Sequence, residues 1–113
     1  MSETMKILLA RRSIRKYKEE PVSDEIIREC LRAAMSAPSA HNQQPWQFVV
    51  IRERKTLLEI TRFHRWAAML KEAPVAILVC ADQTRFKSAS GFWVQDCAAA
   101  TQNILLAATA YGL

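Results

Sequence analysis

Residues 93–113 read WVQDCAAATQNILLAATAYGL, a run of strong helix formers that ends on a glycine able to cap a helix. Apolar residues fall on nearly every face of the predicted helix, so the helix needs to be buried on all sides. The two strands and three shorter helices predicted upstream cannot surround it in so short a chain. The sequence therefore predicts that further protein covers this helix, either a C-terminal portion, a partner subunit or both.

Upstream of this helix, the spacing of apolar residues changes several times along the chain. Three stretches show the helical spacing, 3–12, 24–36 and 55–63, and residues 66–71 are expected to add another turn. Two short and nearly continuous apolar runs, 46–52 and 75–81, predict buried strands. A polar loop bounded by Pro38 and Pro45 precedes the first strand. Two strands separated by a helical stretch suggest, on the pattern alone, an α/β arrangement.

The bulk composition limits the class of protein. A chain of 113 residues is expected to form one domain at most, 1–113. Half of the residues are apolar and 24% are charged, which is the balance of a soluble globular protein and not of a disordered one. No secretory signal is recognisable, and no apolar stretch reaches the ~18 residues that a membrane span needs. We therefore expect a cytoplasmic protein with no membrane partner.

Few residues are candidates for metal binding or acid–base catalysis. The chain has three cysteines, well separated in sequence: Cys30, Cys80 and Cys97. An odd number without close pairs predicts reduced thiols used for packing, and neither disulfides nor a zinc site. His41 and His64 have no further ligand at metal-binding spacing, so no metal is expected. Asp96, the acid inside the apolar helix, is interpreted as an anchor on the helix face.

Basic residues gather near the start of the chain, within a net charge of +5. Six of them precede residue 19: Lys6, Arg11, Arg12, Arg15, Lys16 and Lys18. Such a cluster attracts an anion, either a phosphate-bearing cofactor or a nucleic acid. Arg11 and Arg15, with the Ser13 hydroxyl between them, could form a cradle for phosphate. The alternative is a solvated basic face without a ligand.

The loop of residues 38–45 carries the second group of candidates. Asn42 and Gln44 have side-chain amides that both donate and accept hydrogen bonds, which suits the edge of a heterocycle. The alternative is that Ser39 and Asn42 only satisfy the backbone of their own loop, as these residue types often do. On the residues of this loop alone, the second interpretation is favoured.

Three segments together resemble the nitroreductase family. They are residues 10–17 (ARRSIRKY), 37–48 (APSAHNQQPWQF) and 93–108 (WVQDCAAATQNILLAA). The first is a weak motif, the second is fairly specific, and all three occur in the family's order over essentially the whole chain. The resemblance implies an α+β fold with helices around a central sheet. It also implies an intertwined homodimer with FMN in two clefts at the subunit interface, and it places the family's remaining strands after Leu113.

The resemblance assigns the cofactor contacts residue by residue. It implies that Arg11 and Ser13 meet the phosphate and ribityl end of FMN, that Arg12 lies beside them, and that Arg15 reaches the pyrimidine edge of the ring. The expected contacts from the partner subunit's loop are Pro38, Ser39, Ala40, Asn42 and Gln44. A cation at the ring edge would stabilise the negative charge of the reduced flavin.

The activity implied by the resemblance is that of an NAD(P)H-dependent flavin oxidoreductase. NADH or NADPH reduces FMN, and a nitroaromatic, a quinone or a similar acceptor then takes the electrons in a ping-pong reaction. No catalytic side chain is required, because the flavin carries the chemistry. One alternative is a truncated, non-catalytic relative that no longer binds flavin by itself. The other is a small basic nucleic-acid-binding module, in which the apolar final helix would have no place.

Overall fold

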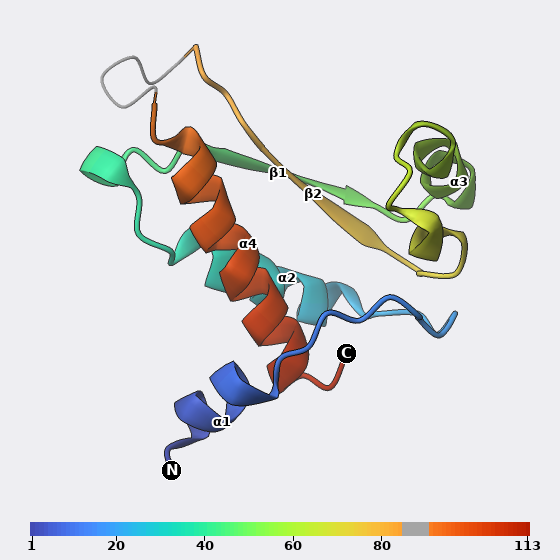
Figure 1. The fold of residues 1–113 in the computed structure, drawn as a ribbon, viewed down its shortest axis with the longest axis horizontal. Coiled ribbons are helices and arrows are strands. Elements are labelled where there is room, and N and C mark those ends of the chain that lie inside the picture. The colour runs from blue at the N-terminus through green and yellow to red at the C-terminus, as the bar shows by residue number, and fades with distance from the viewer. Residues whose placement is uncertain (85–90) are drawn as a thin grey trace. The chain divides into compact units, whose positions relative to one another are not determined.

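The computed structural model describes residues 1–84 and 91–113, and the chain divides into two compact units. The first unit comprises Met1–Arg12, Asp24–Phe48 and Val79–Leu113. The second comprises Ser13–Ser23 and Val49–Leu78. Figure 1 traces the chain through both units.

Three helices and a short 3-10 turn build the first unit. They are α1 (Glu3–Ala10), α2 (Asp24–Met35), η1 (Ala40–Asn42) and α4 (Trp93–Ala110). Helix α2 packs along α4, and α1 contacts α4 (Figure 1). The core between them consists largely of small side chains: Ala34, Ala37, Trp46, Cys97 and Ala100. Small residues let the helix backbones approach closely, and Trp46 fills the space beside them.

Helix α4 ends as its sequence predicts. Gly112 has a φ of +75°, a conformation that residues with a Cβ rarely adopt. Its N–H donates to the Thr109 carbonyl at 3.1 Å, and the N–H of Leu113 donates to the Ala108 carbonyl at 2.9 Å. This pair of bonds is the Schellman arrangement, which satisfies carbonyls at the end of a helix. The predicted glycine cap is confirmed.

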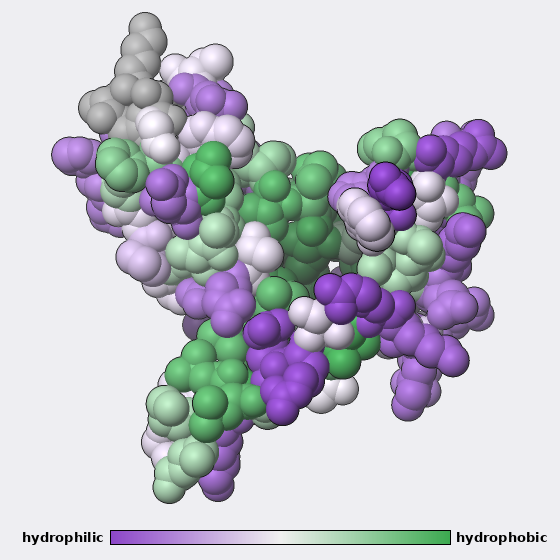
Figure 2. Space-filling model, viewed as in Figure 1, coloured by the Kyte–Doolittle hydropathy of each residue, from purple (hydrophilic) through white to green (hydrophobic). Residues whose placement is uncertain are grey.

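Residues 1–84 and 91–113 do not bury α4 on all sides. Only Asp96, Cys97 and Ala100 are buried on this helix, whereas Val94 is 56% exposed and Leu105 is 42% exposed. Apolar residues, green in Figure 2, lie on the surface over α1 and α4. The expectation that so short a chain cannot surround this helix is confirmed. The further protein that would cover it remains a prediction.

Strands β1 (Trp46–Ile51) and β2 (Ala76–Ala81) pair in a two-stranded sheet. The Asp82 N–H donates to the Pro45 carbonyl at 3.3 Å, and the Cys80 Sγ lies 3.5 Å from the Gln47 carbonyl oxygen. Moving back along β2 therefore means moving forward along β1, so the strands are antiparallel. The α+β class implied by the resemblance fits this pairing better than the α/β arrangement that the pattern alone suggested.

The strand boundaries match the prediction to within one residue, but the predicted burial is wrong. Val49 on β1 is 46% exposed and Leu78 on β2 is 52% exposed. A continuous apolar run permits burial of both faces of a strand, but it does not provide the elements that would cover them. The helices in residues 1–84 and 91–113 cover these two strands only in part.

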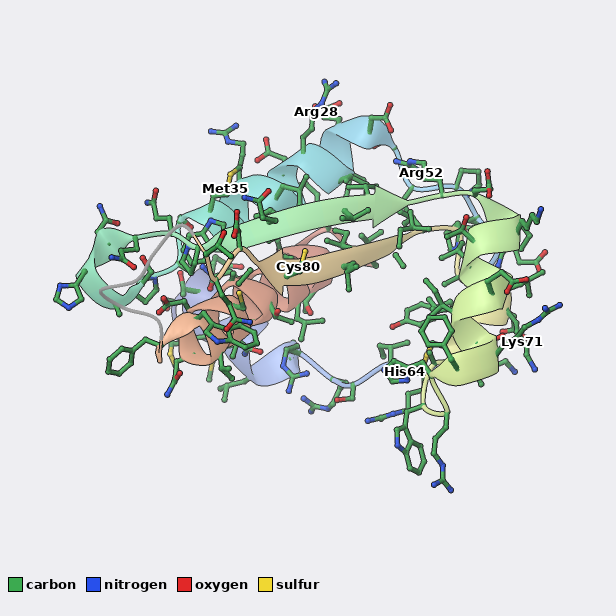
Figure 3. The ribbon with its side chains drawn as sticks, turned by 90° about the horizontal axis from the view of Figure 1, so that it is seen from above. Arg28, Met35, Arg52, His64, Lys71 and Cys80 are labelled. Atoms are coloured by element: carbon green, nitrogen blue, oxygen red, sulfur yellow. The ribbon has the colours of Figure 1, made fainter. Side chains whose placement is uncertain are left out.

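The second unit is built around α3 (Arg54–Phe63) and the 3-10 helix η2 (Ala68–Lys71). Leu57 of α3 is fully buried, and the Arg54 guanidinium joins the two elements. It donates to the carbonyls of Leu70 at 2.7 Å, Lys71 at 3.0 Å and Ala73 at 2.7 Å. Figure 3 labels His64, which follows α3, and Lys71, which ends η2. The helix and the extra turn predicted at 55–63 and 66–71 are confirmed, with small shifts in their boundaries.

Candidate functional site

The loop of residues 38–45 has an unusual backbone. His41 has a φ of 54°, and Asn42 and Gln44 each have a φ of 52°. Residues other than glycine seldom adopt this left-handed conformation, although asparagine and histidine tolerate it better than most. Three such residues within four positions cost free energy, and strain of this kind concentrates at functional sites. The loop is therefore the first place in the molecule to look for a ligand.

Hydrogen bonds within the loop hold this conformation. The Ser39 Oγ accepts from the Gln44 N–H at 3.0 Å, and the Asn42 Oδ1 accepts from the Gln44 Nε2 at 3.2 Å. Ser39 thus satisfies its own loop backbone, as the non-functional interpretation expected. Asn42 pairs with a side chain instead of the backbone. Of the five loop residues predicted to contact the cofactor, the structure brings Ser39, Asn42 and Gln44 into direct contact with one another.

Asp96 ties this loop to α4. Its Oδ1 accepts from the Ala40 N–H at 3.0 Å, and the residue is only 5% exposed. Its Oδ2 is buried and has no hydrogen-bond donor among residues 1–84 and 91–113. The interpretation of Asp96 as an anchor on the helix face is confirmed, but its partner could not be predicted. Sequence reasoning left Asp96 out of the candidate site, and a single acid in an apolar helix was the signal available.

Arg11 and Arg12 end α1 in different ways. The Arg11 N–H donates to the Ile7 carbonyl at 3.2 Å, whereas its guanidinium contacts no hydrogen-bond or ion-pair partner in the part of the chain that the structure describes. The Arg12 guanidinium donates to the carbonyls of Leu9 at 2.7 Å and Arg11 at 2.9 Å. Arg12 therefore caps the helix, and Arg11 has its donors available for an anion.

The other predicted phosphate and ring contacts lie in the second unit. Ser13 and Arg15 are exposed, and the Arg15 Nη1 lies 3.5 Å from the Ser13 carbonyl oxygen, which is a long contact for a hydrogen bond. The structure thus places Ser13 and Arg15 next to each other, but not relative to Arg11 or the loop. Pro38 is also exposed, at the start of the loop in the first unit.

The thiols of Cys30 and Cys97 are buried, and that of Cys80 is partly buried. All three cysteines are free. Burial raises the pKa of the Cys97 thiol, with smaller contributions from Asp96 and Cys80. Burial likewise raises the pKa of the Cys30 thiol, with a smaller contribution from Glu29. A raised pKa keeps a thiol protonated and poorly nucleophilic, which agrees with a packing role.

In the described ranges, 1–84 and 91–113, no group of three or more histidine, cysteine or acidic residues could hold a metal ion. Among the same residues, no helix combines the length and the apolar character required to cross a membrane.

Sequence comparison matches residues 8–65 to the nitroreductase family model. A protein of Methanothermobacter thermautotrophicus, provisionally named an NADH dehydrogenase/NAD(P)H nitroreductase, is 49% identical over 98% of this chain. A protein of Archaeoglobus fulgidus with the same provisional name is 49% identical over the whole chain. This chain spans only 58% and 65% of the length of those two relatives.

The fold of this chain is similar to solved structures that are named as nitroreductases. A structure from Parabacteroides distasonis, with the same provisional name, superposes with a TM-score of 0.92 at 42% identity. The superposition covers 99% of this chain and 65% of that one. A provisionally named nitroreductase from Desulfovibrio desulfuricans, solved in complex with FMN, has a TM-score of 0.84 at 37% identity, over 98% of this chain and 64% of that one. The α+β nitroreductase-like fold is thus confirmed, and the chain belongs to the nitroreductase family.

Proposed function

We propose that this chain is part of an FMN-dependent oxidoreductase that passes electrons from NADH or NADPH to a small acceptor such as a nitroaromatic or a quinone. The observation that carries the proposal is the loop of residues 38–45, whose left-handed backbone is fixed from within and from α4. This loop is one of the two segments in which the family motif supplies cofactor contacts. One similar structure is described as a complex with FMN, and a Bacillus subtilis relative, 35% identical over 79% of this chain, is named FMN reductase.

The basic segment fits the anionic end of FMN. The Arg11 guanidinium has no partner among the described residues, so its planar set of donors can bind a phosphate without losing an existing contact. We assign the Ser13 hydroxyl to the same end of the cofactor. Arg12 already caps α1, and we expect it to contribute mainly through its charge.

The loop fits the ring and the adjoining chain of FMN. The Asn42 Oδ1 is held by Gln44, which leaves the Asn42 amide nitrogen able to donate to a heterocycle. We assign Pro38, Ser39 and Ala40 to contacts beside it, made from the partner subunit of a homodimer. The exposed apolar residues of α4 support such a pairing, because a large exposed apolar surface commonly marks an interface.

Bound FMN would supply the two-electron transfer from the nicotinamide to the acceptor. The chain's own task is then to hold the cofactor, to align the two substrates and to exclude water from the slot that they share. We place Arg15 at the pyrimidine edge of the ring, where a fixed cation stabilises negative charge. No acid or base on this chain has to move a proton for this role.

Steady-state kinetics of the purified full-length protein test the proposal. We expect parallel double-reciprocal plots when NADH or NADPH is varied at several fixed concentrations of a quinone or nitroaromatic, because the two substrates use the same slot in turn. In an anaerobic experiment without acceptor, the reduced nicotinamide should bleach the flavin colour, and the acceptor should restore it. A protein that binds flavin but shows neither bleaching nor turnover would refute the proposed activity.

A further inference from the structure

Asp96 is out of place in the core of the first unit. The other buried residues of α4 are Cys97 and Ala100, and both belong to a buried cluster of alanine, cysteine and tryptophan. Burying a carboxylate among such residues costs free energy unless hydrogen bonds compensate. Its position in the first turn of α4 offsets part of that cost, because the positive end of the helix dipole favours an anion there.

The compensation that Asp96 receives comes from a distant part of the chain. Its Oδ1 accepts from the N–H of Ala40, a residue 56 positions earlier, while its Oδ2 has no donor among residues 1–84 and 91–113. A buried carboxylate with one bonded oxygen and one unbonded oxygen contributes little stability, because an apolar residue of similar size would avoid the cost of desolvating the unbonded oxygen. The carboxylate at this position is therefore better explained by its bond to Ala40, which fixes the position of that residue, than by stabilisation of the core.

Ala40 begins the strained part of the loop. It is the first residue of η1, and the left-handed residues His41 and Asn42 follow it directly. The Ser39 Oγ to Gln44 N–H bond closes the base of the loop, but that bond lies within the loop and does not orient it on the molecule. The bond from Ala40 to Asp96 joins this turn directly to α4.

We infer that Asp96 is a positioning residue for the cofactor: it holds the Ala40–Asn42 turn against α4 and thereby sets the affinity for FMN without touching the flavin. The inference rests on the proposed function, because it gives this loop the role of a flavin contact. It goes further by naming a residue on another element as the one that keeps the contact in place.

The test uses the full-length protein as its natural gene encodes it, in flavin-free and FMN-loaded form. Asp96→Ala removes the acceptor, and Asn103→Ala is the matched control. Asn103 also lies on α4 and makes one part-buried bond to a distant backbone, from its Nδ2 to the Ala33 carbonyl at 2.9 Å. That bond ties α4 to α2 and not to the loop. The readouts are the FMN dissociation constant by fluorescence titration, amide hydrogen exchange of residues 39–44 without flavin, and the thermal unfolding midpoint.

We expect Asp96→Ala to raise the FMN dissociation constant at least about tenfold, the equivalent of ~1.4 kcal/mol, and to speed amide exchange in the loop. Asn103→Ala should lower the unfolding midpoint while leaving the dissociation constant within about twofold of the wild type. Should Asp96→Ala fail to fold, Asp96→Leu removes the same acceptor while an apolar side chain of similar size fills the buried position. It should give the same rise in the dissociation constant.

Other results would contradict either the positioning role of Asp96 or the proposed binding of FMN. If the variants that lack the Ala40–Asp96 bond unfold earlier but bind FMN as tightly as the wild type, Asp96 is a structural anchor only and the inference is wrong. A wild-type protein that takes up no FMN would overturn the proposed function itself.

Discussion

Arg11 and Arg12 are adjacent at the end of α1, yet their guanidinium groups have different surroundings. Arg12 donates to the carbonyls of Leu9 and Arg11, so its charge caps the helix. Arg11 donates only through its backbone, and its side chain is partly buried at the start of the motif segment. The sequence motif alone treats the two arginines as equivalent, and the structure separates them.

Replacing Arg11 should therefore weaken cofactor binding more than replacing Arg12. We expect Arg11→Ala to raise the FMN dissociation constant by about tenfold to a hundredfold, the usual value of one or two charge-assisted hydrogen bonds to phosphate. Arg12→Ala should chiefly lower the thermal unfolding midpoint, because a helix cap is lost. Fluorescence titration and thermal unfolding of both variants provide the comparison. Equal losses of FMN affinity would contradict the division of roles.

The buried thiols give the free energy of unfolding a predictable dependence on pH. Burial raises the pKa of Cys30 and of Cys97 above the ordinary value of 9.0. The folded state therefore holds these protons more tightly than the unfolded state does. This contribution to stability is complete below the pKa of the unfolded thiols, and it is lost as the pH rises through the higher folded values.

We accordingly expect the thermal unfolding midpoint to fall as the pH is raised from about 8 to about 10.5. A variant carrying Cys30→Ala and Cys97→Ala should show a shallower fall over the same range, since its other titrating groups are unchanged. A slope identical to that of the wild type would show that these thiols do not contribute.

At the scale of the elements, Arg54 is the clearest example of one side chain joining two segments. Its guanidinium accounts for three hydrogen bonds to the carbonyls of residues 70, 71 and 73, which orders η2 against α3. Arg54→Ala should lower the free energy of unfolding by about 1.5 to 3 kcal/mol, the usual worth of hydrogen bonds to a charged group. Arg54→Lys should recover only part of this loss, because an ammonium cannot reproduce the planar fork. Denaturant unfolding measures the free energy of unfolding of both variants. An Arg54→Lys variant as stable as the wild type would argue against the importance of the three guanidinium–carbonyl hydrogen bonds.

Local chemistry determined how much of each element could be predicted. Helix α4 was predicted almost to the residue, because its helix formers and Gly112 act over a few neighbouring positions. The loop of residues 38–45 was predicted as a loop, but its left-handed residues were not, since His41 and Gln44 rarely adopt that backbone without tertiary support. The bonds of Arg54 and of Asp96 join residues 16–19 and 56 positions apart, and no local pattern reports such contacts. Ser13 and Arg15 were predicted as part of a phosphate cradle from their residue types and as FMN contacts from the resemblance, and both assignments stay predictions.

At the scale of the whole molecule, the apolar surface of α4 is the feature that the chain leaves unexplained by its own packing. Val94, Leu105 and Tyr111 are each more than 40% exposed. We expect Leu105→Arg to weaken the proposed homodimer, because a charge would then have to be buried at the contact. Leu58→Arg, at a residue of α3 that is 41% exposed, is the control. Sedimentation of the two variants at micromolar concentration should show a monomer for the first and a dimer for the second, and two dimers would contradict the interface.

The flavin content of the purified full-length protein shows whether its two motif segments bind FMN. We expect a yellow protein that releases about one FMN per chain on denaturation, or that takes up FMN to this ratio when the cofactor is added. A folded but colourless protein that fails to bind added FMN would show that these segments do not hold the cofactor.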